Sequence, residues 1–316
     1  MLGAAGGIGQ PLSLLLKEHK DITHLSLYDV ANAPGVAADL SHIPSKAKVT
    51  GHRGADQLAA ALKGSDVVVI PAGVPRKPGM TRDDLFNTNA SIVATLMDGV
   101  AAACPKAMVL IIANPVNSTV PISAEVMKKH GVYDPKRLFG VTTLDVLRAN
   151  TFVAEAQGGA PASTEVEVIG GHAGITILPL LSRVAGKALP ADTIEKLTPR
   201  IQFGGDEVVK AKANPDGSGG SATLSMAVAG ARFVASVIKG LKGEKAVECA
   251  YVQSDAVPGV KYFSTKVELG KEGVAKIHPV GKLTAYEQGW FDKMLPELKT
   301  SIANGEKFSA TWGQKK

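Results

Sequence analysis

The chain has few of the residues that mark disulfide-stapled, metal-bound or membrane-spanning proteins. Only 2 of its 316 residues are cysteine, and Cys104 and Cys249 lie far apart and form no CxxC motif. This usage argues against a disulfide framework and favours a reducing compartment. Apolar runs stay short of the roughly 20 residues that cross a bilayer, so no membrane association is expected.

Aromatic residues are also scarce, at 5% of the chain, whereas hydrophobic residues reach 45%. The core must then rest on Val, Ile, Leu and Ala, as it does in parallel sheets covered by helices on both faces. The net charge is +6, and the Lys and Arg residues are scattered without interleaved aromatics. This pattern speaks against nucleic-acid binding, and the basic balance suits anionic small molecules equally well.

The first half of the chain alternates short apolar runs with longer amphipathic stretches. Strands are predicted at 25–28, 67–71 and 108–112, and helices at 8–20, 56–63 and 89–104. Strand–helix–strand repetition predicts an α/β fold in which a doubly wound parallel sheet has right-handed crossovers. Met1 and Leu2 lead directly into Gly3, so only the end of a first strand is expected there.

The second half, from about residue 143, predicts an α+β unit. Helices are predicted at 143–156, 193–213, 224–240 and 284–304, and short strands at 166–170, 175–178, 247–252, 262–268 and 275–278. Pro199 and Gly204-Gly205 are expected to kink or break the helix over 193–213. The segment 214–220 is expected to be a surface loop. We therefore expect two domains, 1–142 and 143–316.

Three glycines open the first predicted helix. Gly3, Gly6 and Gly9 fit a G-x-x-G-x-x-G pattern, which allows a tight turn and seats a pyrophosphate at the helix N-terminus. Asp29 follows twenty residues after Gly9, where it can bond ribose hydroxyls and repel a 2′-phosphate. The pattern predicts NAD rather than NADP. The alternative is a glycine-rich turn with an unrelated surface aspartate.

Arg76 and Arg82 lie six residues apart in a Pro- and Gly-containing stretch, 74–85, that follows a predicted strand. Loops at strand ends carry binding groups in α/β folds, and the planar guanidinium meets a carboxylate with two hydrogen bonds. The pair therefore suggests a lid that captures an anion with two acidic ends. The alternative is a solvated basic loop.

Four further residues are candidates for chemistry. Asn114 ends a predicted strand and is expected to face a ligand crevice, unless it belongs to an ordinary Asn-Pro turn. Asp145 and Arg148 share a helix face, either as a surface ion pair or as a partner of a catalytic base and a carboxylate ligand. His172 lies among glycines, and histidine suits proton transfer near neutral pH. The other histidines form no metal-binding motif, so no metal site is expected.

Together these segments resemble the lactate/malate dehydrogenase family, and most closely its malate-specific members of mitochondrial and enterobacterial type. The matching segments are 3–10, 27–29, 34–43, 75–85, 114–120, 140–150, 169–179 and 221–226. The resemblance implies a Rossmann NAD-binding domain followed by an α+β substrate domain. It also implies NAD as cofactor and malate or oxaloacetate as substrate. The loop over 214–220 is longer than the family's usual link.

The resemblance also implies a role for each site residue. His172 is the proton acceptor, Asp145 its partner, and Arg82 polarises the reacting carbonyl. Arg148 binds the carboxylate next to the reacting carbon, and Arg76 binds the far one. The substrate-binding set is Arg76, Arg82, Asn114 and Arg148. The cofactor-binding set is Gly3, Ala4, Ala5, Gly6, Gly7, Ile8, Gly9, Asp29, Asn89, Ile112, Ala113, Asn114 and Met226.

Two other functions compete with this reading. Arg76 argues against a lactate-type 2-hydroxy acid dehydrogenase, because a buried guanidinium opposite a methyl group would be costly. His172 and Asp145 argue against an NAD-binding interaction protein that has lost catalysis. The family analogy further implies a homodimer that uses a helix within 35–43. It also implies the mitochondrial matrix, with the peroxisome, glycosome or cytosol as alternatives.

Overall fold

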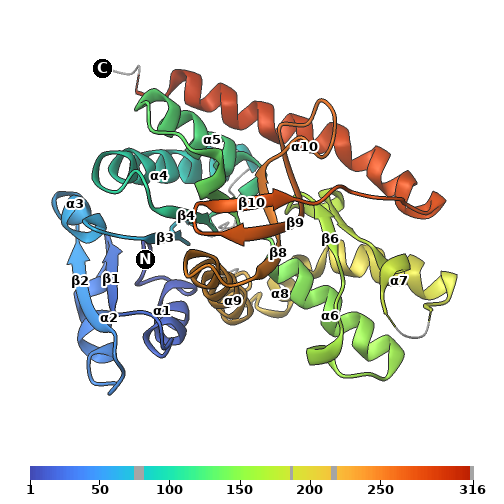
Figure 1. Ribbon diagram of the computed structural model, residues 1–316, viewed down its shortest axis with the longest axis horizontal. Helices are drawn as coiled ribbons and strands as arrows, with labels where there is room; N and C mark the ends of the chain where they lie inside the picture. The colour runs from blue at the N-terminus through green and yellow to red at the C-terminus, as the bar shows by residue number, and fades with distance from the viewer. Residues whose placement is uncertain (75–81, 186–187, 215–218, 314–316) are drawn as a thin grey trace.

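A parallel sheet with flanking helices forms the N-terminal half of the chain (Figure 1). The structure is a computed structural model that describes residues 1–74, 82–185, 188–214 and 219–313. The strands of this half are β1 (His24–Asp29), β2 (Lys48–Arg53), β3 (Val67–Ile70), β4 (Met108–Ile111) and β5 (Leu138–Gly140). Its helices are α1 (Gly9–Lys17), α2 (Ala33–Leu40), α3 (Leu58–Leu62), α4 (Arg82–Ala103) and α5 (Val116–Lys129).

The first three residues join the strands into one layer. Leu2 donates its N–H to Val69 O (2.9 Å) on β3, and Gly3 donates its N–H to Tyr28 O (2.9 Å) on β1. With β1 paired to β2 and β3–β4–β5 in parallel register, the spatial order is β2, β1, residues 1–3, β3, β4, β5. This is the doubly wound order, so the predicted parallel sheet is confirmed.

Helices cover both faces of this sheet because successive strand side chains point to opposite sides. Along β4, Val109 and Ile111 belong to one core cluster, and Met108 and Leu110 to another. The first cluster contains side chains of α4 and α5, and the second contains side chains of α1 and a later helix, α9 (Leu224–Leu241). All four residues of β4 are buried, which explains its uninterrupted apolar sequence.

The C-terminal half adds antiparallel strands to the same sheet. Its helices are α6 (Thr143–Gln157), α7 (Ala191–Gln202), α8 (Gly204–Ala211), α9 and α10 (Ala285–Thr311). Its strands are β6 (Val168–Gly170), β7 (Ile177–Pro179), β8 (Ala246–Gln253), β9 (Tyr262–Gly270) and β10 (Gly273–Ile277). Short 3₁₀ turns in the two halves together are η1 (Ala55–Gln57), η2 (Pro135–Arg137), η3 (Pro161–Ser163), η4 (Gly174–Thr176) and η5 (Leu181–Arg183).

Gly140 of β5 pairs with Tyr251 of β8, so the sheet continues from parallel to antiparallel strands in the order β3–β4–β5–β8–β9–β6–β7.

Three elements, β2, α5 and the three-residue strand β5, have no counterpart among the predicted ones. No residue of β2 is buried, so its sequence lacks the apolar run of a core strand. Helix α5 begins directly after Pro115, where the Asn-Pro pair favours a turn. The predicted break near Gly204 is confirmed, since α7 ends at Gln202 and α8 begins at Gly204. Pro199 lies inside α7 without ending it.

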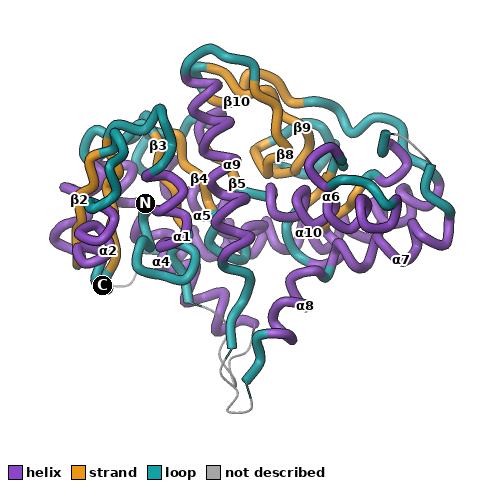
Figure 2. The backbone as a smooth tube through the Cα atoms, turned by 90° about the horizontal axis from the view of Figure 1, so that it is seen from below, coloured by secondary structure: helices purple, strands orange, loops and turns teal. Residues whose placement is uncertain are grey.

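Helix α9 is the most apolar long helix among the described residues. Its 18 residues are long and apolar enough to cross a membrane by length and composition alone. In the fold, 44% of these residues are buried. In the fold it packs against α1, α6 and β9, with Phe233 and Val234 in the core. Figure 2 shows it between the N-terminal sheet and the elements of the C-terminal half. This packing accounts for the apolar residues on the buried face of the helix.

Candidate active site

A histidine and an aspartate from different elements form the centre of the candidate site. His172 lies in the turn after β6, and Asp145 lies in the first turn of α6. His172 Nδ1 is 2.5 Å from Asp145 Oδ2, and the exposed fractions of the two side chains are 9% and 0%. A carboxylate at Nδ1 holds that nitrogen as the donor and leaves Nε2 as the free acceptor. The pair can therefore accept a proton at Nε2.

Arg148 lies one turn further along α6 and faces the same aspartate. Its Nη1 is 3.7 Å from Asp145 Oδ1, and its side chain is 14% exposed. Burial lowers the pKa of the Arg148 guanidinium, and Asp145 opposes that shift. The group remains a cation because arginine keeps its proton in proteins. Gly204 leaves room for it, since a Cβ there would lie 3.1 Å from Arg148 Cδ.

The glycine-rich turn is shaped by close backbone packing. A Cβ on Gly9 would lie 2.0 Å from Gly3 O, and Gly3 has a positive φ of 107°. Asp29 Oδ2 accepts the N–H of Ala5 (2.9 Å), which ties the end of β1 to the turn. Gly6 and Gly7 are exposed just before α1, and no side chain caps that helix. These residues fit a dinucleotide, because uncapped N–H groups at a helix N-terminus suit a pyrophosphate.

Asn89 joins the ends of two neighbouring strands. Its Oδ1 accepts the N–H of Val74 (2.8 Å), and its Nδ2 donates to Asn114 O (2.9 Å). The amide of Asn89 is thus occupied by backbone, whereas the side chain of Asn114 is exposed. At the same edge Ile112 is buried in one cluster with Met226 of α9. The structure therefore brings the strand-end residues of the predicted cofactor set together.

Of the two arginines predicted to form a lid, Arg82 lies within the described residues. Arg76 lies outside the described residues. Arg82 is the first residue of α4, so it belongs to a helix start and not to the loop predicted for 74–85. The predicted loop therefore ends before Arg82, because the backbone from this residue onward is helical.

Two polar residues that were not predicted complete the surroundings of His172. Asn117 of α5 accepts the backbone N–H of His172 with Oδ1 (2.8 Å) and donates from Nδ2 to Thr176 Oγ1 (3.1 Å). Both residues are buried. The only sequence signal is that Asn117 follows Asn114 by three residues, which does not reveal a contact 55 residues further along the chain.

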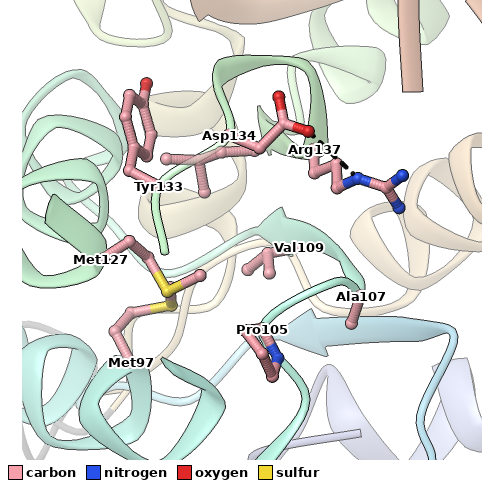
Figure 3. A pocket seen from close by; sticks show the side chains of 9 residues that line it. Met97, Pro105, Ala107, Val109, Met127, Tyr133, Asp134 and Arg137 are labelled. Carbon is pink, nitrogen blue, oxygen red and sulfur yellow. Dashed lines mark hydrogen bonds and ion pairs between the residues drawn. The ribbon is translucent and has the colours of Figure 1, made fainter. Parts of the chain in front are cut away.

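Two cavities are lined by residues other than His172 and Asp145. A cavity of about 10 Å³ beneath Tyr133 is lined by Met97, Met127 and the ion-paired Asp134 and Arg137 (Figure 3). It has room for about one water molecule. A larger cleft of about 790 Å³ lies between α1 and α2. Within the described ranges, no three His, Cys, Asp or Glu side chains gather as a metal-ligand set.

Comparison with known proteins covers nearly the whole chain. Residues 1–140 match the family model for the lactate/malate dehydrogenase NAD binding domain, and residues 142–309 match that for the alpha/beta C-terminal domain. A mitochondrial malate dehydrogenase of Caenorhabditis elegans is 63% identical over 309 residues, covering 98% of this chain and 89% of the relative. That of Homo sapiens is 59% identical over 313 residues, covering 98% and 91%. The apo malate dehydrogenase of Picrophilus torridus has a TM-score of 0.82 at 25% identity, covering 98% of this chain and 97% of that one.

Proposed function

The chain belongs to the lactate/malate dehydrogenase family, and from this premise we infer that it is an NAD-dependent oxidoreductase that interconverts malate and oxaloacetate. The relatives at 63% and 59% identity are named malate dehydrogenases, which supports malate over lactate. Both are also named mitochondrial, and the expected compartment is the mitochondrial matrix. The observation that carries the chemistry is the contact of His172 with the buried Asp145, with 2.5 Å between Nδ1 and Oδ2.

His172 is proposed to take the hydroxyl proton of malate at Nε2 and to return it during oxaloacetate reduction. Asp145 holds the ring through Nδ1 and stabilises the imidazolium that forms. The reverse reaction uses that imidazolium as a donor to the carbonyl oxygen, where negative charge grows. When bound, NAD supplies the acceptor for the hydride that leaves C2 of malate.

The remaining site residues are proposed to orient the substrate. Arg148 is a partly buried cation beside Asp145, so it suits the carboxylate next to the reacting carbon. Asn114 has an exposed amide at the end of β4, within the crevice where α/β folds bind ligands. Arg82 is proposed to polarise the carbonyl, and Arg76 to bind the far carboxylate. Fixing both carboxylates presents C2 in a single orientation, which lowers the entropic cost of reaction.

The cofactor is proposed to lie along the carboxyl edge of the parallel sheet. Gly6 and Gly7 offer an exposed helix N-terminus to the pyrophosphate, and Asp29 stands at the end of β1 to bond the ribose. A carboxylate there repels a 2′-phosphate, which supports NAD over NADP. Met226 and Ile112 supply apolar surface near the strand ends.

A homodimer is proposed to form through α1, α2 and α9. Leu14 is 45% exposed and Val228 is 51% exposed, on helices α1 and α9, which pack against each other. The 790 Å³ cleft between α1 and α2 is lined by Leu14, Val36 and Ile43. Exposed apolar side chains around such a cleft favour burial against a second copy. Light scattering should give twice the chain mass of 32.7 kDa, and a single chain mass would contradict the dimer.

The loss of NADH absorbance tests the function directly. Oxaloacetate should be reduced at the expense of NADH. The reaction should be far slower when pyruvate replaces oxaloacetate or when NADPH replaces NADH. The His172→Ala variant should bind NADH normally, as measured by fluorescence, while turnover falls by about 100-fold or more. Turnover of pyruvate in preference to oxaloacetate would contradict the substrate, and full turnover without His172 would contradict the mechanism.

A further inference from the structure

We propose that Asn117 is a positioning residue that holds the proton acceptor His172 at a set distance from the substrate-binding Asn114. The inference rests on the proposed function, because it requires His172 to exchange the proton with substrate. Asn117 itself is buried and meets the backbone of His172, so its action on the reaction passes through His172.

Every polar atom of the Asn117 side chain is used across the two halves of the chain. Oδ1 accepts the His172 N–H (2.8 Å), and Nδ2 donates to Thr176 Oγ1 (3.1 Å). Thr176 Oγ1 in turn accepts the N–H of Ala173 (3.1 Å) and donates to Ala173 O (2.7 Å). The backbone carbonyl of Asn117 accepts from the buried Tyr251 hydroxyl (3.2 Å) on β8. One residue at the start of α5 therefore fastens both sides of the turn that carries His172.

The contacts of Asn117 with His172 and Thr176 form a clamp on this turn. The position of Asn117 in the chain connects this clamp to the proposed substrate site. Asn114 lies three residues earlier, and Asn89 fixes its carbonyl at 2.9 Å. Asn114 and Asn117 thus belong to one short segment, whose first residue faces the ligand crevice and whose last holds His172. Asp145 fixes the ring of His172, whereas Asn117 ties the His172 main chain directly to the segment that carries Asn114. A displacement of this kind by about 1 Å costs roughly 100-fold in rate.

Glycine at 171 is what lets the clamp close. A Cβ on Gly171 would lie 2.6 Å from Asn117 Oδ1 and 2.7 Å from Thr176 Oγ1. Such contacts are too short for real Cβ atoms, so any side chain would drive the amide and the hydroxyl away from the turn. Gly171 therefore serves the fit of Asn117 and Thr176 against the turn.

The test compares variants at this clamp in the full chain. Asn117→Leu keeps the approximate volume and removes the acceptor, whereas Asn117→Asp keeps an oxygen for the His172 N–H. Ser118→Ala is the matched control, since Ser118 is also buried on the first turn of α5 but bonds Ser301 O (2.7 Å) of α10 instead. The measurements are kcat and KM for oxaloacetate, NADH binding by fluorescence, and the thermal midpoint.

For Asn117→Leu we expect kcat to fall about 100-fold, with NADH affinity and oxaloacetate KM within about threefold of the parent. Asn117→Asp should recover about tenfold of that loss, and Ser118→Ala should stay within about threefold of the parent. A parent-like kcat for Asn117→Leu would overturn the proposal. So would an Asn117→Asp variant as slow as Asn117→Leu, or an equal loss in Ser118→Ala.

Gly171→Ala decides the question if Asn117→Leu does not fold. It retains every hydrogen-bonding group but forces the clamp apart, so the same loss in kcat with unchanged NADH binding is expected. A parent-like kcat in Gly171→Ala would overturn the proposal. An inactive parent chain would instead refute the proposed function, so the two failures can be told apart.

Discussion

His172 Nδ1 lies 2.5 Å from Asp145 Oδ2, although 27 residues separate the two in the chain. The contact joins the turn after β6 to the first turn of α6, and Asp145 has no exposed surface. A buried carboxylate in this place holds Nδ1 as the donor and so favours one tautomer of the imidazole. The relationship supports the proposed role of His172 as proton acceptor, with Nε2 as the nitrogen that faces away from Asp145.

Replacement of Asp145 by asparagine should slow turnover without loss of cofactor. The amide can donate to Nδ1, which would leave the proton on Nε2 and remove the acceptor. We expect kcat for malate oxidation to fall about 100-fold or more, with NADH binding unchanged by fluorescence. Asp192→Asn is the matched control, since Asp192 is also in the first turn of its helix but is exposed. Equal kcat in the two variants would contradict the role of Asp145.

Replacement of Gly9 by alanine should weaken both the fold and cofactor binding. The new Cβ would lie 2.0 Å from Gly3 O, so the turn must open. We expect a loss of about 1–3 kcal/mol in the free energy of unfolding, and NADH affinity lower by about tenfold. Gly289→Ala on α10, where a Cβ meets nothing within 4 Å, should leave both unchanged or raise stability. Denaturant unfolding measures the free energy of unfolding, and titration measures the NADH affinity. Parent-like values of both for Gly9→Ala would contradict the need for a tight turn at this position.

Replacement of Arg76 by glutamine should affect substrate more than cofactor. The proposed partner is the far carboxylate of oxaloacetate, which a neutral amide binds less well. We expect kcat/KM for oxaloacetate to fall about 100-fold, while NADH affinity stays the same. The preference for oxaloacetate over pyruvate should become smaller. Arg183→Gln serves as a control, because Arg183 is held by Glu167 and by backbone carbonyls. Unchanged oxaloacetate kinetics in Arg76→Gln would remove Arg76 from the substrate site.

Glu287 should make the stability of the chain sensitive to acid. Burial alone would raise the pKa of this carboxyl, but hydrogen bonds from Thr284 and Ser182 outweigh it, so the pKa lies below its ordinary value of 4.5. The carboxylate therefore stabilises the fold fully above pH 4.5, and this contribution is lost as the pH falls through the lowered pKa. Glu287→Gln should cost about 1–3 kcal/mol at pH 7, with a smaller difference from the parent at pH 4.

The exposed Glu297 of the same helix supplies the control for this prediction. Glu297→Gln should leave the free energy of unfolding within about 0.5 kcal/mol of the parent at either pH. Urea unfolding at pH 7 and pH 4 measures the difference. If the Glu287→Gln deficit were the same at both values, its titration would not govern the acid response.

The elements that could be predicted are those whose own side chains carry the signal. β3 and β4 are apolar throughout because both of their faces are buried, and the amphipathic helices α6 and α9 begin within a residue of their predicted starts. β2 could not be found, because it lies at the edge of the sheet and buries no residue. α5 could not be predicted, because the Asn114-Pro115 pair locally indicates a turn, whereas in the fold Pro115 directly precedes the helix.

By itself the sequence determined the family and the cofactor, and it supplied the candidate groups of the proposed site, because glycine spacing, Asp29 and His172 are local features of the chain. Only the tertiary structure decided how these groups meet. His172 meets Asp145 because the turn after β6 packs beside α6, and Asn117 reaches the same turn from the other half of the molecule. Contacts between distant segments depend on the packing of whole elements, which no residue pattern in one segment encodes.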